Sequence, residues 1–392
     1  MKSRTPLSPF LLLSLLCFST LCGQGKKQKP INYAFNSKNW ATLTDNVSFD
    51  DYKGVSAASS TNDKPFQIIL KDVEFANGII EFDVELKGMG FPGITFRIDK
   101  DSLNGEIFYL RHFGDPDPML RTTMQYAAIV DKVNLWDLTD EYQAASNLLE
   151  NQWNHIKMVI NGKQMRVYVN DMKKPSLYIP SMEGITSSGA ISLSGNVVFA
   201  NMQITPDATE GIPADEGYDP TASDPRYLRN WQVTEPIDFP FGQDLLKGIP
   251  YSPGVAIRDD LWDSTATWQD VKASRRGLVN LTYNFGQTES GSRRLTWLKT
   301  TINAKTAISK RLDLGFSDEV WLFINGQPLY IDKNYYGSPG MKEPKGRCTL
   351  ENSSIDIPLQ EGENEILIGL TNYFYGWGVI ARFSNNEGIV HL

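Results

Sequence analysis

The chain has 392 residues, of which 41% are hydrophobic, so it is long enough for two domains with apolar cores of ordinary size. Its formal net charge of −8 makes nucleic acid and anionic membrane surfaces poor partners, and we predict no nucleic-acid partner. Aromatic residues make up 11% of the chain, a share that suits bulky β-cores or platforms on which sugar rings stack.

The N-terminus has the pattern of a secretory signal. Lys2 and Arg4 precede an apolar run, residues 10–21, that is too short to cross a bilayer. No later stretch reaches the roughly 18 uninterrupted apolar residues that a membrane-spanning helix needs. We therefore predict a signal peptide over residues 1–25, no membrane-spanning segment, and an exported protein that is periplasmic, cell-surface or extracellular.

The cysteines indicate neither a lipid anchor nor a disulfide. A bacterial lipidation site resembles a small residue directly before the cysteine, whereas Leu21 precedes Cys22, so lipid anchoring at Cys22 is not expected. After signal cleavage Cys348 is the one certain cysteine, and it has no partner in the mature chain. The fold should therefore depend on apolar cores rather than on disulfides.

The first half of the mature chain consists of short alternating runs. These predicted strands cover residues 66–70, 78–86, 93–98, 106–111, 155–160, 165–169 and 190–194. Between two of them lies Asn161-Gly162, a dipeptide that favours the positive φ angles of a tight turn and predicts a hairpin over residues 156–169.

The second half also consists of short alternating runs, which follow a region that is rich in proline and acidic residues. Residues 206–225 have almost no apolar periodicity and predict a linker between domains at 30–205 and 226–392. Asn325-Gly326 marks a second turn, and a short helix is expected only around residues 139–149. The predicted strands are 277–283, 294–301, 319–324, 327–331, 354–358, 364–370 and 378–383. The fold class is all-β, with two β-sandwiches.

Several segments of residues 30–205 carry a family resemblance: GIIEFDVELKG, FPGITFRID, EIFYLRHFGDPD, MQYAAIV, NLWDL, QWNHIKMVINGKQMRVYVND and SSGAISL. On these segments, residues 30–205 resemble a concanavalin A-like jelly roll, and in particular the 3-keto-disaccharide hydrolase-like domains of exported bacterial proteins. The family usually has Asn-Ser-Gly before the strand that ends in Phe-Arg, whereas this chain has Phe91-Pro92-Gly93, so a polar loop has become apolar.

Residues 226–392 contain the segments FSDEVWLFINGQPLYIDKNYYG, PLQEGENEILIGL and YGWGVIARF. On these segments, this half is similar to the galactose-binding-like β-sandwich that accompanies many glycoside hydrolases. They imply the fold more than a binding site, and fold alone does not determine function.

Three carboxylates in one predicted strand are the candidate catalytic residues. Glu81, Asp83 and Glu85 alternate with apolar residues, so they should project from one face of the strand. The spacing resembles the catalytic motif of glycoside hydrolase family 16. Retaining hydrolysis needs carboxyl groups about 5 Å apart, whereas positions i and i+4 of a strand lie about 13 Å apart, so a structural acidic face is the alternative.

A second cluster is a candidate sugar-binding surface on the concave sheet that the resemblance implies. Guanidinium, phenol and amide groups supply directed hydrogen bonds, and aromatic rings supply a stacking face. The candidates are Arg97, Tyr109, Arg111, His112, Gln125, Tyr126 and Trp136. The alternative is that Tyr109 packs in the core and the arginines pair with Glu106 or Asp115.

Aromatic residues in Gly-flanked, loop-like positions of the second half are the other candidates for sugar binding: Tyr335, Tyr336, Tyr375 and Trp377, with Tyr373 and Phe374 beside them. Exposed rings there suit either a glycan platform or the interface between the two domains. Trp321 alternates with Phe323 on a strand and is expected in the core.

We predict no cofactor and no metal site of the cysteine-histidine type, because no such spacing occurs. Asp115 and Asp117 offer hard oxygen ligands for a structural calcium ion, although the same residues suit an Asx turn. Three functions are left open: an exported carbohydrate-binding protein, a glycoside hydrolase or keto-sugar-cleaving enzyme, and a structural or adhesion protein that binds another protein. The first is favoured, because no carboxylate pair has a confirmed catalytic context.

Overall fold

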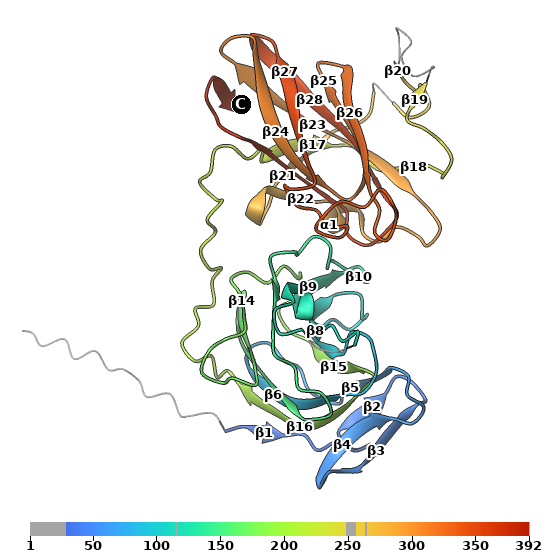
Figure 1. Cartoon of the computed structure of the whole chain (residues 1–392), viewed down its shortest axis with the longest axis vertical. Helices are drawn as coiled ribbons and strands as arrows, with labels where there is room; N and C mark the ends of the chain where they lie inside the picture. Colours follow the sequence, from blue (N-terminus) through green and yellow to red (C-terminus); the bar gives the residue numbers. More distant parts are fainter. Residues whose placement is uncertain (1–28, 115–116, 248–255, 263–264, 392) are drawn as a thin grey trace, which may run out of the picture.

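The computed structural model describes residues 29–114, 117–247, 256–262 and 265–391, and it places two β-sandwiches end to end (Figure 1). Every strand pair within these ranges is antiparallel. The helical elements there are α1 (Thr282–Phe285) and the 3-10 turns η1 (Arg121–Thr123) and η2 (Arg275–Gly277). The predicted fold class is therefore confirmed, while the predicted signal peptide lies outside the described residues.

Two sheets form the N-terminal sandwich. The first, here called the β6 sheet, runs in the order β14 (Leu177–Ile179), β13 (Gln164–Val169), β12 (Asn154–Asn161), β6 (Gly78–Leu86), β16 (Val197–Pro206), β4 (Val55–Ser60) and β3 (Val47–Tyr52), with β1 (Ile31–Asn32) on β16. The second, here called the β8 sheet, runs in the order β10 (Val133–Asn134), β9 (Met124–Val130), β8 (Gly105–Leu110), β7 (Gly93–Ile98), β15 (Ala190–Gly195), β5 (Phe66–Leu70) and β2 (Trp40–Thr42), with β11 (Gln143–Ala144) on β9.

The period of two along each strand decides which side chains fill the space between these sheets. On β6, Ile80, Phe82 and Val84 are buried in the core, so the alternating carboxylates face outward. On β8, Phe108 and Leu110 lie in the core, so Tyr109 faces outward from the other sheet. The two faces that carry candidate site residues are thus on opposite sides of the sandwich.

The C-terminal sandwich also has two sheets. One runs in the order β21 (Gln269–Lys272), β17 (Asn230–Val233), β23 (Arg294–Ala304), β28 (Gly362–Asn372), β25 (Asp318–Ile324) and β26 (Gln327–Asn334), with β18 (Ile237–Asp238) and β30 (Ile389–His391) on β23. The other runs in the order β22 (Leu278–Asn280), β29 (Gly378–Phe383), β24 (Ile308–Phe316) and β27 (Ser353–Leu359). A separate pair is β19 (Leu246–Lys247) with β20 (Ala256–Ile257).

Both predicted hairpins form. Ile156 pairs with Val169 as expected, although the turn residues are Gly162 and Lys163, because Asn161 still pairs with Gln164. In the second hairpin Asn325 and Gly326 form the turn itself, with φ angles of 52° and 75°. Positive φ at both central residues is the conformation that an Asn-Gly dipeptide favours.

Two predicted elements are wrong. The expected helix at residues 139–149 is absent, since the segment forms turns and strand β11, and Tyr142 turns inward to meet Tyr126 with ring centroids 5.4 Å apart. The expected strand at residues 277–283 is only β22, followed directly by α1. In both places tertiary packing, which a local pattern does not record, determines the backbone.

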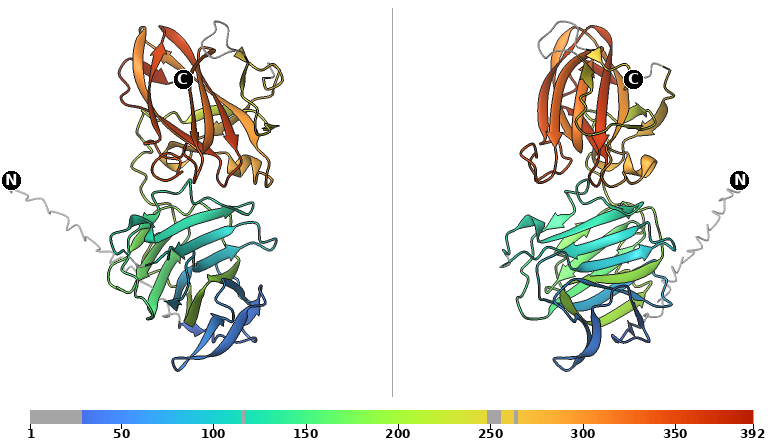
Figure 2. Two further views of the ribbon diagram at one scale, coloured as in Figure 1. Left: turned by 45° about the vertical axis from the view of Figure 1, so that its right-hand side comes forward. Right: turned by 90° about the vertical axis from the view of Figure 1, so that its right-hand side faces the viewer.

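Figure 2 shows the two sandwiches end to end. They share a small apolar cluster to which β9, β10, β22 and β29 all contribute residues. Leu135 and Leu138 from the first half pack there with Leu278 and Ile380 from the second. Residues 207–225, the predicted linker without its first residue, contain no strand, while Pro206 ends β16. No helix in the described residues is long and apolar enough to cross a membrane.

Candidate functional site

A pocket of about 310 Å³ lies where the outer face of the β8 sheet meets loops of the C-terminal sandwich. We call it the junction pocket. Its lining residues come from the loop before β7, from β8 and the residue after it, from β10 and the segment that follows it, and from two loops of the second sandwich. They are Phe91, Ile107, Tyr109, Arg111, Asn134, Trp136, Tyr336, Arg347, Phe374 and Tyr375. Five of these ten are among the residues expected to bind sugar.

The floor of the junction pocket is a hydrogen-bonded group on β8 and β9. Tyr109 and Gln125 are paired across the two strands, and the Tyr109 hydroxyl donates to Gln125 Oε1 over 3.0 Å. The Arg111 guanidinium donates to both of them, with 3.0 Å to the Tyr109 hydroxyl. Burial raises the pKa of Tyr109 to about 12, so the phenol remains a neutral group.

Aromatic rings form the walls. The Trp136 ring lies 5.1 Å from that of Tyr336 and 5.8 Å from that of Tyr375, both edge to face, while Phe374 stacks parallel to Tyr336 at 6.0 Å. Tyr336 and Tyr375 are each nearly half exposed. The rings are therefore held by their neighbours and still present surface to a ligand.

Buried carboxylates fix the two loops that carry these rings. Asp318 Oδ2 accepts the backbone N–H groups of Tyr373 over 2.6 Å and of Phe374 over 3.1 Å. Asp137, from the first sandwich, accepts the N–H of Gly376 and, through its carbonyl, that of Cys348 over 2.9 Å. Burial raises the pKa of Asp137 to about 7, so its charge changes near neutral pH.

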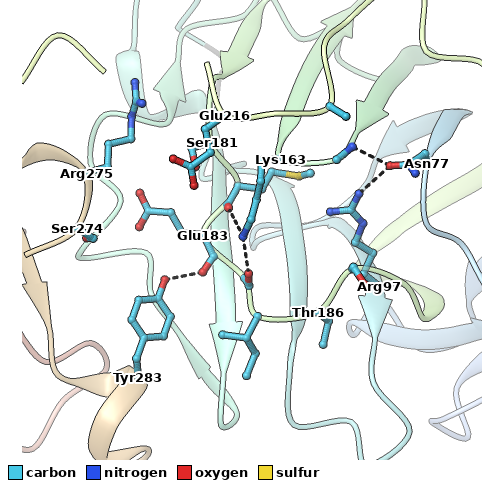
Figure 3. A pocket seen from close by; sticks show the side chains of 16 residues that line it. Asn77, Arg97, Lys163, Ser181, Glu183, Thr186, Glu216, Ser274, Arg275 and Tyr283 are labelled. Carbon is cyan, nitrogen blue, oxygen red and sulfur yellow. Dashed lines mark hydrogen bonds between the residues drawn. The ribbon is translucent and has the colours of Figure 1, made fainter. Parts of the chain in front are cut away.

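A larger cleft of about 840 Å³ lies between the same two sandwiches on the side of the linker (Figure 3). Its polar groups mostly bond to one another: Arg97 donates to Asn77, the Tyr283 hydroxyl donates to the carbonyl of Glu183, and Lys163 donates to two carbonyls. Tyr283 is its one aromatic lining residue. This arrangement suits a joint between sandwiches better than a surface for sugar rings.

No protein-family model matches the chain, and no curated protein matches it. Several solved structures are similar to parts of it. The carbohydrate-binding module CBM66 from Bacillus subtilis is 16% identical, with 42% of this chain and 93% of the module covered and a TM-score of 0.32. A β-glucanase from Bacillus licheniformis is 11% identical, with 46% and 99% covered and a TM-score of 0.33. A putative glycosyl hydrolase from Parabacteroides distasonis ATCC 8503 is 14% identical, with 43% and 89% covered and a TM-score of 0.30.

Five candidate residues lie away from the junction pocket. Arg97 has a φ of 53° at a register shift between β7 and β15, and this turns its guanidinium to Ala76 and Asn77. His112 is enclosed by Gly88 and Glu150. Tyr126 is in the core and donates to Glu106 over 2.6 Å, and Trp377 is fully buried. Tyr335 packs on Tyr373 and does not line the pocket.

The three carboxylates proposed as catalytic share the outer face of β6, as the spacing predicted, but line neither pocket. Glu85 is buried and accepts bonds from Tyr52, Lys53 and Lys87, with both lysine nitrogens at 2.6 Å. Although its burial alone would raise the pKa of Glu85, these donors hold the pKa below its ordinary value. Its role in the structure is that of an ion-pair centre.

Glu81 and Asp83 surround His155 on the same face. His155 Nδ1 lies 2.6 Å from Asp83 Oδ1, and Nε2 lies 3.5 Å from Glu81. Hydrogen bonds to Asp83 and Glu81 raise the pKa of His155 to about 9. The pKa of His155 in the folded protein lies above its ordinary value of 6.5, so the ion pairs of the protonated ring add to the free energy of unfolding. This contribution is complete below pH 6.5 and is lost as the pH rises through about 9, where the ring loses its proton.

We expect the NMR chemical shifts of the His155 ring C–H protons to change with pH with a midpoint near 9. An Asp83→Asn variant, which keeps the shape of the partner and removes its charge, should lower that midpoint toward 6.5. A midpoint at or below 6.5 in the unaltered protein would contradict the ion-pair cluster.

Of the two residues predicted to bind calcium, Asp117 is among the described residues and Asp115 lies outside them. Asp117 Oδ1 accepts the N–H of Met119 over 2.9 Å, as in an Asx turn. Across the described ranges, no group of three or more His, Cys, Asp or Glu side chains is arranged to hold a metal ion.

The sequence did not single out Phe91, Ile107, Asn134 or Arg347 as site residues, although it showed that an apolar Phe91 replaces a polar loop residue. That departure was the one available signal. Arg347 is more than 200 residues from Arg111 in the chain, so nothing local relates the two.

Proposed function

We propose that this protein is an exported carbohydrate-binding protein and that the junction pocket is its binding site. The observation that carries the proposal is the convergence of the Trp136, Tyr336 and Tyr375 rings on the hydrogen-bonding group of Tyr109 and Arg111. Sugar rings combine apolar C–H faces with hydroxyl groups, so a pocket with both stacking surface and directed donors matches them.

Binding is favoured over cleavage by the composition of the pocket. None of its ten lining residues carries a carboxyl group, whereas most glycoside hydrolases use a pair of Asp or Glu side chains at the scissile bond. The three carboxylates on β6 are held in ion pairs on the opposite sheet. We also propose that residues 30–205 and 226–392 act as one unit, because the pocket needs both.

The test is a screen of residues 26–392 against immobilised β-glucan, xylan and polygalacturonate, followed by titration calorimetry on each glycan that is retained. Trp136→Ala and Tyr375→Ala should each weaken binding roughly tenfold or more, since a stacking ring in the centre of a small site contributes much of its affinity. Tyr218→Ala is the matched control, because Tyr218 is 83% exposed and lines neither pocket.

Equal affinities for the unaltered protein and the Trp136→Ala variant would place the site elsewhere. Release of shorter sugars that is lost in Glu81→Gln or Glu85→Gln would instead establish the hydrolase alternative, with its centre on β6.

A further inference from the structure

The junction pocket is positively charged although the whole chain carries −8. Arg111 and Arg347 are its only charged lining residues. The two lie near each other, and the charge of Arg347 adds to burial in lowering the pKa of Arg111. Two guanidinium groups in a small, partly desolvated space attract an anion more strongly than they would in water.

Arg111 forms no ion pair within the described residues. Its hydrogen bonds go to the carbonyl of Thr122 over 2.9 Å, the hydroxyl of Tyr109 and the amide oxygen of Gln125, all of which are neutral acceptors. Its guanidinium also lies 5.0 Å from the centre of the Tyr109 ring. The positive charge is thus positioned by neighbours that do not neutralise it.

The guanidinium of Arg347 has only long contacts with its hydrogen-bond acceptors. Its side chain is 5% exposed, and its two hydrogen bonds, to Gln143 and to the carbonyl of Lys345, are long at 3.3 and 3.4 Å. Its buried Nε makes no hydrogen bond, although Asp140 Oδ1 lies 3.3 Å away. That carboxylate also pairs with Arg121 over 2.9 Å, so one acidic group is shared by two guanidinium groups.

A buried guanidinium with poor partners is costly unless something else supplies an acceptor. Its fork geometry matches a carboxylate, which can accept two parallel N–H bonds. The Arg347 guanidinium lies 5.0 Å from the centre of the Trp136 ring, so an anion bound there would sit beside the stacking surface.

Resting on the function proposed above, we propose that the junction pocket recognises an acidic sugar, with Arg111 and Arg347 binding the carboxylate of a uronic acid residue that stacks on Trp136. The requirement is for one carboxylate close to a pyranose face, as in galacturonic or glucuronic acid. A neutral sugar of the same shape would leave Arg111 without a counter-charge and would leave Arg347 with only the Asp140 carboxylate that it shares with Arg121.

Matched ligands test the charge alone. An oligogalacturonide should bind the protein, and its methyl ester, which keeps the sugar rings and removes the charge, should bind more weakly by on the order of tenfold or more. Affinity for the acid form should fall as salt is raised from low to physiological ionic strength, while affinity for the ester should change little. Equal binding of the acid and the ester would overturn the proposal.

Arginine variants test the residues. Arg111→Gln and Arg347→Gln should each reduce binding of the oligogalacturonide and the preference over its ester, and Arg347→Lys should keep the salt dependence while losing affinity. Arg166→Gln removes the same charge from β13, where Arg166 lies 5.9 Å from the Tyr178 ring centre, and should change neither.

The outcomes separate this inference from the function on which it rests. If neutral glycans bind as well as the oligogalacturonide and only Trp136→Ala weakens them, carbohydrate binding stands and the acidic-sugar assignment fails. If a sulfated galactan binds and the oligogalacturonide does not, the carboxylate assignment fails. If no glycan binds, both fail together.

Discussion

An Arg276→Met variant should unfold at a urea concentration well below that of the unaltered protein, with a loss of about 3–5 kcal/mol in the free energy of unfolding. Arg276 lies at the joint between the sandwiches, where its guanidinium is 2.8 Å from Glu183 Oε1 and 2.9 Å from Glu141 Oε2, and it also donates to the carbonyl of Leu138 over 2.8 Å. Its removal leaves two acidic groups near each other, of which Glu183 is only 9% exposed.

The pKa of Arg276 is raised despite its burial, because the charges of Glu183 and Glu141 outweigh the desolvation. A Glu183→Gln/Arg276→Met double variant removes the buried uncompensated carboxylate together with its partner, so it should recover part of the lost stability. The single variant should also weaken glycan binding, since the junction pocket needs both sandwiches in place. Unchanged stability of the single variant would show that Arg276 does not hold the joint.

An Arg293→Met variant should lose stability by a similar amount, about 3–5 kcal/mol, inside the C-terminal sandwich. Arg293 is 2.5 Å from Glu319, with side-chain exposures of 5% and 3%, and donates to the carbonyl of Phe239 over 2.8 Å. Without it, Glu319 keeps the exposed Lys333 at 3.2 Å as its ion-pair partner, together with a bond from Thr371.

The matched control is Arg311→Met, because Arg311 pairs with Asp356 on the surface, where the side chains are 54% and 60% exposed. An exposed pair of this kind contributes about 0–1 kcal/mol, so the control should unfold close to the unaltered protein in urea. Equal effects of the two variants would contradict the buried ion pair of Arg293.

Much of the fold could be predicted because apolar and polar side chains alternate along its strands with a period of two. Strands β5, β6, β7 and β29 have the residue limits that the alternation gave, and both predicted hairpins formed, one of them with its turn one residue later than predicted. The helix expected at residues 139–149 did not form, because Gln143 and Ala144 pair with β9 and Tyr142 packs against Tyr126, and a local apolar pattern records neither contact.

The sequence predicted binding residues in each sandwich separately, but it did not predict that they form one pocket. Tyr109, Arg111, Gln125 and Trp136 followed from neighbouring strands of one sheet, and Tyr336 and Tyr375 from exposed loops of the other half. Their meeting depends on the packing of two sandwiches, which neither half encodes locally. Arg97 was predicted on the sugar-binding face, but its positive φ turns the side chain toward Ala76 and Asn77 instead. An alternating strand pattern does not reveal such a backbone irregularity.

The most direct test of the junction pocket as the binding site is hydrogen–deuterium exchange of the protein with and without an excess of the oligogalacturonide. Bound ligand should slow exchange in residues 134–137 of the first sandwich and in residues 335–347 and 373–377 of the second, because these segments form the two walls. Protection confined to residues 81–85, or to residues 181–187 and 274–283 around the larger cleft, would contradict the account.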